Sequence, residues 1–386
     1  MTSRSRALVL AISTPIIAFA FIGGYLGQAL AKDDTYQHLR VFEDVVSLVV
    51  NNYVEPVDVR EAMKGAMRGL ADNLDPESAF LPPDLVRTRE LNDPGGPAEV
   101  GLDLTRQYYL RVISARDGSP AARAGIRAGD FIRAIDNRPT RDMSAYEGGR
   151  LLRGAPGSKV SLLVIRGNAA DPHVVDLVRE RLAGPEITSR MADGTTGYIR
   201  VLQFSAESAS RLKQTVDALA KTGATRYLID LRGTSRGDLD EGLAAARLFV
   251  KGGTLGIRLG RADRREPIAG QATDGAVTAP LALLVDIGTA GAAEVFAAAL
   301  DGNGRADLVG TNTLGRAARQ RLVKLPDQSG LWLTYLRYLT PSGDPIHEKG
   351  LPPDVEVEPL EIEFGAELPT PDATIQSGLQ HLSTRK

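Results

Sequence analysis

The sequence predicts a multidomain α+β chain: a membrane segment, a helical region, a β-rich module and an α/β domain. Three observations predict this order. An uncharged apolar stretch opens the chain, apolar residues then recur at helical spacing, and short strands between Gly and Pro turns precede a regular strand–helix alternation. With 386 residues, 43% hydrophobic and 24% charged, the chain can build two or three globular domains.

The apolar stretch Ala7–Ala31 predicts that the chain meets a membrane. At about 1.5 Å per residue, a helix of this length crosses a hydrocarbon core of about 30 Å. Arg4 and Arg6 precede it, which places the N-terminus in the cytoplasm and the body outside. Cleavage of a signal peptide after Ala29–Ala31 is the alternative. Residues 1–33 are therefore expected to be an inner-membrane anchor, or the signal peptide of a protein secreted to the periplasm.

Residues 34–95 are predicted to be helical. Leu39, Phe42 and Val49 belong to a set of apolar residues at helical spacing. A second helix is expected over Arg60–Leu74, where Asp75-Pro76 ends it. The Gly- and Pro-rich residues 92–97 then form a linker.

Residues 96–183 are predicted to form a module of short strands, with candidates at Tyr109–Ile113, Asp130–Ile135 and Lys159–Ile165. Short helices are expected over residues 121–125 and 144–152. Several spaced motifs in this stretch resemble a PDZ domain: Gly101-Leu102-Asp103-Leu104, Ser119-Pro120-Ala121-Ala122, Ala124-Gly125-Ile126, Gly129-Asp130 and Gly157-Ser158-Lys159-Val160.

That resemblance implies peptide capture on an exposed edge strand, with backbone N–H groups binding a terminal carboxylate. Asp103 stands where the family commonly has a second glycine, and its charge is expected to disfavour a bound carboxylate. The alternative is a module that only packs against its neighbour and positions it. The implied peptide-binding residues are Val100, Gly101, Leu102, Asp103 and Leu104.

Residues 184–362 alternate between strands and helices, which predicts a parallel or mixed sheet covered by helices. Residues 363–386, which contain Pro369 and Pro371, are predicted to be a flexible tail. The expected strands are Gly197–Leu202, Tyr227–Leu231, Leu281–Ile287 and Ala306–Val309, and the expected helices are Ala206–Lys221, Asp238–Phe249 and Ala292–Leu300.

Motifs spread over nearly the whole chain resemble the carboxyl-terminal processing (tail-specific) serine proteases. The resemblance implies a ClpP/crotonase-like β-sheet with helices, and endopeptidase activity on C-terminal or unfolded segments of exported proteins. The motifs include Leu74-Asp75-Pro76-Glu77-Ser78, Gly197-Tyr198-Ile199-Arg200, Leu228-Ile229-Asp230-Leu231-Arg232, residues 285–290 and 292–300, Thr340-Pro341-Ser342-Gly343 and Pro353-Asp354-Val355.

The two catalytic positions of that family carry other residues here. The family uses a serine nucleophile three residues before a helix-start glutamate, and a lysine base 25 residues after the serine. Those positions are Gly291, three before Glu294, and Arg316, 25 residues later; Gln320 retains the glutamine of the motif. Glycine offers no nucleophile, and arginine stays protonated with a pKa above about 12. The resemblance therefore implies a catalytically inactive member.

The loop after the central strand also departs from the family pattern. Where the family has Arg-Asn-Asn-Pro-Gly-Gly, this chain has residues 232–237, Arg-Gly-Thr-Ser-Arg-Gly. The family loop helps to form an oxyanion hole from free N–H groups. The equivalent positions here are Arg236, Gly237 and Ala292.

Three functions remain open: a non-catalytic peptide- or protein-binding pseudoprotease or regulator, an active serine peptidase with a relocated site, and a structural subunit of an active homologue. Thr289, Ser235 and Lys324 are the candidates for relocated catalysis. Arg316 is either an ion-paired structural residue or a ligand for a peptide carboxylate. Self-association is a further possible partnership.

Composition excludes several other classes of function. The chain has no cysteine, so disulfides and thiolate chemistry are excluded. Its four histidines are isolated in sequence, so no metal site or other cofactor is expected. The net charge is −2 with interspersed signs, which gives nucleic-acid binding no support.

Overall fold

The computed structural model describes residues 36–167, 172–360, 362–366 and 369–384, in two compact units that divide between Gly69 and Leu70. In the first unit, residues 36–52 are helical, and Leu39, Phe42 and Val49 are exposed on that helix. Helix α2 (Val59–Asp72) confirms the second predicted helix to within two residues. No helix within the described ranges is long and apolar enough to cross a membrane. The predicted anchor, Ala7–Ala31, lies outside the described residues.

The prediction of helix throughout residues 34–95 is wrong at one point. Strand β1 (Ala79–Leu81) follows α2, and helix α3 (Pro83–Glu90) follows the strand. All three residues of β1 are buried, and they pair antiparallel with β16 (Gly330–Leu339). The run is too short for a period-2 pattern to show, and its partner lies far along the chain.

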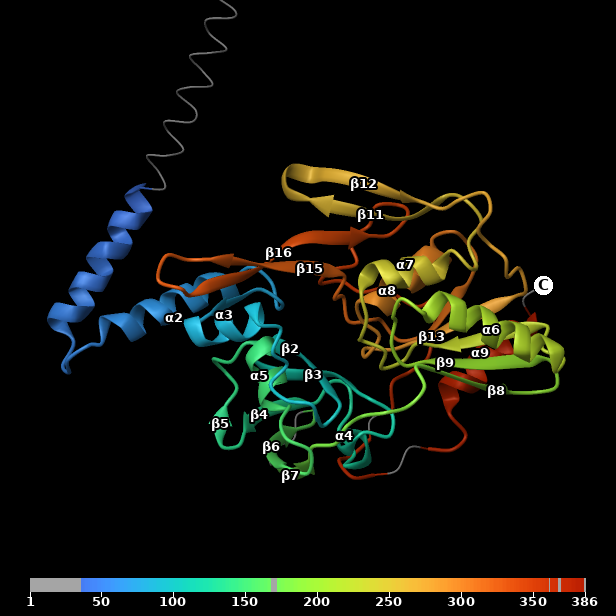
Figure 1. Cartoon of the computed structure of the whole chain (residues 1–386), viewed down its shortest axis with the longest axis horizontal. Helices are drawn as coiled ribbons and strands as arrows, with labels where there is room; N and C mark the ends of the chain where they lie inside the picture. Colours follow the sequence, from blue (N-terminus) through green and yellow to red (C-terminus); the bar gives the residue numbers. More distant parts are fainter. Residues whose placement is uncertain (1–35, 168–171, 361, 367–368, 385–386) are drawn as a thin grey trace, which may run out of the picture. The chain divides into compact units, whose positions relative to one another are not determined.

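The middle of the chain folds into a six-stranded antiparallel sheet with two short helices, which confirms the predicted PDZ-like strands and helices (Figure 1). Strand β2 lies at one edge of this sheet and β7 at the other. Alternate side chains of β2, β3 and β6 fill a separate hydrophobic core. The elements are β2 (Leu102–Gln107), β3 (Tyr109–Ala115), α4 (Pro120–Arg123), β4 (Phe131–Ile135), β5 (Arg138–Pro139), α5 (Ala145–Leu151), β6 (Lys159–Ile165) and β7 (His173–Val178).

The α/β region has a six-stranded sheet in the order β17-β14-β13-β10-β9-β8, parallel except at β8. Helices α6, α7 and α8 pack on one face in the main core. The central strand β13 is buried at every residue, as a strand covered on both faces requires. The elements are β8 (Ile187–Met191), β9 (Thr196–Val201), α6 (Ser208–Lys221), β10 (Arg226–Asp230), α7 (Leu239–Ala246), β13 (Leu281–Val285), α8 (Ala292–Asp301), β14 (Asp307–Gly310) and β17 (Val355–Glu356).

The prediction of a flexible tail is wrong for its last part, which forms helix α9 (Ala373–Thr384). This helix covers the other face of the sheet, where Leu382 packs with Leu228 and Leu284. Gly378 allows the close approach, because a Cβ there would lie 2.8 Å from both leucines. The two prolines before the helix misled the prediction, because prolines near a helix start do not show whether the residues after them are ordered.

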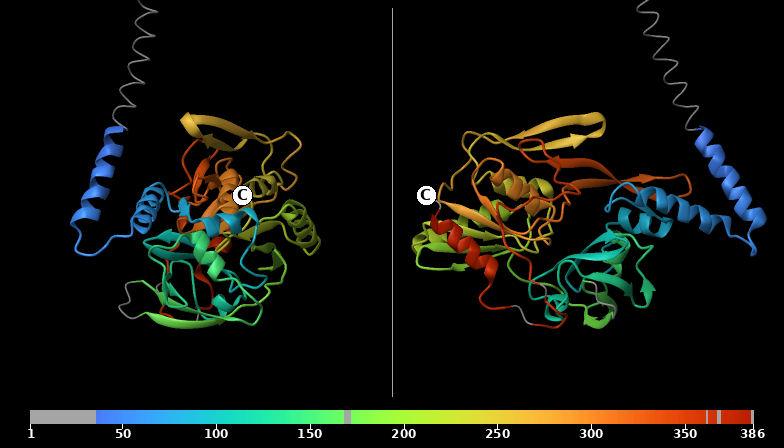
Figure 2. Two further views of the ribbon diagram at one scale, coloured as in Figure 1. Left: turned by 60° about the vertical axis from the view of Figure 1, so that its left-hand side comes forward. Right: turned by 180° about the vertical axis from the view of Figure 1, so that it is seen from behind.

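A second sheet contains β1, β16, β15 (Ala318–Lys324), β11 (Thr254–Gly260) and β12 (Arg264–Ala269). The 3₁₀ turn η1 (Arg261–Asp263) joins β11 to β12, and Figure 2 shows the resulting hairpin in both views. Lys324 is the last residue of β15.

Candidate active site

Gly291 occupies the sharp turn between β13 and α8. Its φ of 63° and ψ of −117° favour glycine, because a side chain strains this backbone. A Cβ added there would lie 3.7 Å from the Ser235 carbonyl oxygen and 3.9 Å from that of Arg316, so space for a side chain exists. Sharp strand-to-helix turns of this kind present the nucleophile in other hydrolases. The turn keeps that shape but carries no attacking group.

Glu294 ties the two altered positions together. Its Oε2 accepts hydrogen bonds from the backbone N–H of Gly291 at 3.0 Å and of Arg316 at 2.7 Å. Its Oε1 accepts from the N–H of Gly315 at 2.6 Å and the hydroxyl of Thr313 at 2.5 Å. The side chain is fully buried, and burial raises its pKa. Positions 291 and 316 therefore lie side by side, as the motif predicted, because both backbones bind Glu294 in the first turn of α8.

Arg316 pairs with a carboxylate that the motif analysis did not assign to the site. Its Nε donates to Glu77 Oε2 at 2.9 Å, across 239 positions of sequence. The Glu77 side chain is only 8% exposed and also accepts a 2.8 Å bond from the Thr105 hydroxyl. The charge of Glu77 raises the pKa of Arg316, so this arginine is still less able to act as a base. Only the Leu74–Ser78 motif hinted that Glu77 matters.

The larger of two adjoining cavities collects most of the predicted site residues. It measures about 570 Å³, and Gly237, Gly291, Arg316 and Gln320 line it. Gln320 donates from Nε2 to the Thr334 hydroxyl at 3.1 Å. Ala292 does not line the cavity, although it is the first residue of α8, where N–H groups lack intrahelical partners.

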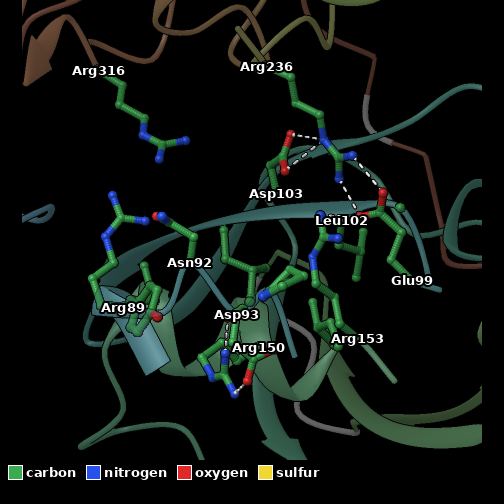
Figure 3. Close-up of a pocket in the computed structure, with 17 residues that line it drawn as sticks. Arg89, Asn92, Asp93, Glu99, Leu102, Asp103, Arg150, Arg153, Arg236 and Arg316 are labelled. Carbon is green, nitrogen blue, oxygen red and sulfur yellow. Dashed lines mark hydrogen bonds and ion pairs between the residues drawn. The ribbon is translucent and has the colours of Figure 1, made fainter. Parts of the chain in front are cut away.

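Arg236 stands at the oxyanion-loop position but reaches toward the PDZ module (Figure 3). Its Nε lies 2.9 and 3.0 Å from the two oxygens of Asp103, and its terminal nitrogens donate to both oxygens of Glu99 at 2.9 Å. Ser235 adds a 2.6 Å bond to Asp103. Burial works to raise the pKa of Asp103, but the charge and hydrogen bonds of Arg236, the hydrogen bond from Ser235 and the charge of Arg316 together lower it. The pair with Arg236 offsets the charge of Asp103, which was expected to disfavour a bound carboxylate, although Asp103 still lines both cavities.

The smaller cavity lies between the edge strand β2 and helix α5, where a PDZ domain holds its peptide. It measures about 370 Å³, and Gly101, Leu102, Asp103 and Leu104 line it. Val100 does not line it, because its side chain is fully buried in the core of the module. Both cavities share Arg89, Asp103, Arg153, Arg236 and Arg316, so they adjoin.

Each of the three candidates for relocated catalysis already contacts another described residue, and Thr289 Oγ1 also lies 3.2 Å from the carboxylate of Asp286. The Ser235 hydroxyl lies 2.6 Å from Asp103, whose lowered pKa makes it a weak proton acceptor. Thr289 is fully buried and donates to the carbonyl of Leu231 at 3.0 Å. Lys324 is exposed and pairs with Glu90. Within the described ranges, no group of three or more His, Asp or Glu residues could hold a metal ion.

The fold and the turn at position 291 define a class of serine peptidase carrying a PDZ domain. The sequence matches peptidase family S41 over residues 195–357 and the PDZ domain over residues 111–166. The structure aligns with a photosystem II D1 C-terminal processing protease with a TM-score of 0.70 and 28% identity, over 82% of this chain and 86% of that one.

Sequence similarity to individual proteases identifies the family within this class. A carboxyl-terminal-processing protease of Picosynechococcus is 34% identical over 87% of this chain and 81% of its own length. One from Synechocystis is 32% identical over 91% and 83%, and CtpA of Bacillus subtilis is 28% identical over 98% and 82%. This chain belongs to the carboxyl-terminal processing proteases.

Proposed function

We propose that this protein is a non-catalytic member of its family that binds peptide or protein segments in the groove formed by the two adjoining cavities. The observation that carries the proposal is the pair of residues at the dyad positions, Gly291 and Arg316. Removal of a catalytic serine from another protease cost about 10⁶ in turnover. An ion-paired arginine adds the loss of the base. The cavity around these positions measures about 570 Å³, and both Gly291 and Arg316 line it.

The cell envelope is the proposed location of this function. Arg4 and Arg6 before the apolar Ala7–Ala31 stretch support a membrane anchor or signal peptide with the body in the periplasm. Exported proteins with accessible C-terminal or unfolded segments are then the proposed partners, together with an active homologue that this protein would regulate or support.

A cleavage assay tests the absence of catalysis. Purified full-length chain is incubated with an unstructured polypeptide that has an apolar C-terminus, and products are followed by mass spectrometry. We expect no product above a buffer control. Product formation that disappears in Ser235→Ala or Thr289→Ala would overturn the proposal, whereas product that persists in both would identify a contaminating protease.

Restoring the serine and lysine of the family at positions 291 and 316 tests why the site lacks catalysis. We expect Gly291→Ser with Arg316→Lys to remain inactive, because the buried carboxylate of Glu77 would hold the new lysine protonated. Adding Glu77→Gln removes that charge, so the triple variant should cleave more than the double variant. The altered loop at residues 234–237 should still keep its activity low. If the double variant alone cleaves efficiently, Glu77 does not control the position.

A further inference from the structure

Within the described ranges, Arg89 is a cation held in place without a counter-ion. Its guanidinium lies 4.3 Å from the ring centre of Trp332 and 5.7 Å from that of Tyr146. The guanidinium makes no hydrogen bond or ion pair with any residue that the structure describes. It lines both cavities at their junction. Stacking between two rings limits its motion, so little entropy remains to be lost when it binds an anion.

The other arginines of the groove are already engaged, with one exception. Arg316 uses only Nε, on Glu77, and its two terminal nitrogens donate no hydrogen bond to a described residue. It too lines both cavities. The engaged pairs are Arg150 with Asp93, Arg153 with Glu99, Arg236 with Glu99 and Asp103, and Arg319 with Asp238 and Asp240.

The surroundings of Arg89 and Arg316 suit a peptide better than a free ion. The edge strand β2 lines the smaller cavity, and an edge strand can pair with an extended backbone. Leu102, Leu104 and Trp332 add apolar surface for side chains. Guanidinium groups bind carboxylates through paired N–H donors, and both arginines have such donors left over.

We propose that Arg89 and Arg316 form a carboxylate clamp, which binds a carboxylate of a peptide lying in the groove. The carboxylate comes from an acidic side chain or from the peptide's C-terminus. The clamp rests on the proposed peptide-binding function and names the ligand chemistry of the same groove. Arginine at position 316 then has a role of its own: it replaces a proton acceptor by a permanent cation.

Three peptides of about eight residues, each spanning about 26 Å when extended, separate the sources. One is apolar with an amidated C-terminus, the second is the same peptide with a free C-terminus, and the third is amidated with one central glutamate. Each carries a dye, and fluorescence anisotropy measures its affinity for the full-length chain. We expect the second or the third to bind about 10- to 100-fold more tightly than the first. The tighter of the two identifies the source of the carboxylate.

Variants test the two arginines directly. Arg89→Gln should remove the preference for a carboxylate, and so should Arg316→Gln combined with Glu77→Gln, which avoids leaving a buried carboxylate unpaired. Arg321→Gln is the matched control: Arg321 also stacks on an aromatic ring, 5.4 Å from Tyr335, but lines neither cavity. Circular dichroism checks that each variant is folded. Trp332 is the only tryptophan in the chain, so its fluorescence gives a second signal beside Arg89.

Equal affinity for all three peptides, or a carboxylate preference that survives both arginine variants, would overturn the clamp and leave peptide binding intact. If none of the peptides binds, the clamp and the proposed peptide-binding function fail together. Cleavage of a peptide would overturn only the non-catalytic assignment.

Discussion

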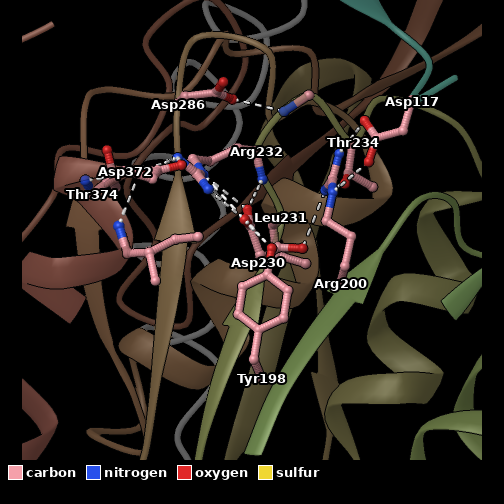
Figure 4. Close-up of polar contacts among 12 residues, drawn as sticks. Asp117, Tyr198, Arg200, Asp230, Leu231, Arg232, Thr234, Asp286, Asp372 and Thr374 are labelled. Carbon is pink, nitrogen blue, oxygen red and sulfur yellow. Dashed lines mark hydrogen bonds and ion pairs between the residues drawn. The ribbon is translucent and has the colours of Figure 1, made fainter. Parts of the chain in front are cut away.

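Two clusters of arginines and carboxylates lie in the second compact unit, one around Asp230 and one around the groove. In the first, Arg232 holds Asp230 at 2.6 Å and also reaches Asp372 at 2.9 Å, before helix α9 (Figure 4). Tyr198 donates to Asp230 at 2.7 Å, and Arg200 pairs with Asp117 at 3.0 Å. These contacts join β9, β10, the segment before α9 and the loop after β3. The cluster is a structural joint.

The groove cluster differs because some of its guanidinium nitrogens have no hydrogen-bond partner among the described residues. Every guanidinium drawn around Asp230 has a carboxylate partner, whereas Arg89 has none among the described residues and Arg316 uses one nitrogen. Charge alone does not separate the two clusters, since both are rich in arginine. Unused donors beside a cavity separate them, because a saturated pair can bind nothing further.

Loss of Asp230 should give the largest effect on stability. Asp230→Asn leaves Arg232 without its buried partner, and breaking a buried pair from one side costs about 3–5 kcal/mol. Urea unfolding followed by circular dichroism measures the change. Asp217→Asn is the control, because its pair with Lys213 is exposed and contributes less than about 1 kcal/mol. Similar losses in both variants would contradict the structural role given to Asp230.

Glu294→Gln should have a smaller effect, on the order of 1–3 kcal/mol. The carboxylate of Glu294 now accepts hydrogen bonds from three backbone N–H groups. The glutamine amide would accept through one oxygen only, and its NH₂ group would lie against N–H donors without an acceptor. The variant should also loosen the turn at Gly291 and the residues around Arg316. Hydrogen exchange at these two positions would show the loosening. Unchanged exchange, with unchanged stability, would mean that Glu294 does not hold the site together.

The sequence predicted the elements of the fold better than it predicted the contacts of the site. Apolar runs in a strand–helix alternation identified β10, β13 and α8, because each run is long enough to stand out from its Gly-rich flanks. Motif spacing brought Gly291 and Arg316 to one place, and the structure confirms that they are neighbours through Glu294. Short β1 and helix α9 gave no clear pattern and were missed.

The partners of the charged side chains could not be predicted from spacing. Glu77 lies 239 residues before Arg316, and Asp103 lies 133 residues before Arg236. The first pair depends on how the segment after α2 packs beside the residues before β15, and the second on how the PDZ module packs against the loop after β10; no local pattern encodes either contact. For the same reason the pairing of Asp103 with Arg236 was not predicted, and Arg89 was not noticed at all.

Acid should weaken the Asp230 joint, and this is the smallest effect that we expect. Burial works to raise the pKa of Asp230, but the hydrogen bonds and charge of Arg232, the charge of Arg200 and the hydrogen bond from Tyr198 together hold the pKa below the usual value of 3.8. A carboxyl group with a lowered pKa in the folded state stabilises the protein above its unfolded pKa, and that contribution is lost as the pH falls through the folded value. Asparagine does not titrate, so the difference in unfolding free energy between the wild type and Asp230→Asn should be constant above about pH 5 and shrink below about pH 4. Urea unfolding at several pH values measures this difference. A difference that shrinks already above pH 5 would assign the effect to another group and leave Asp230 without its electrostatic role.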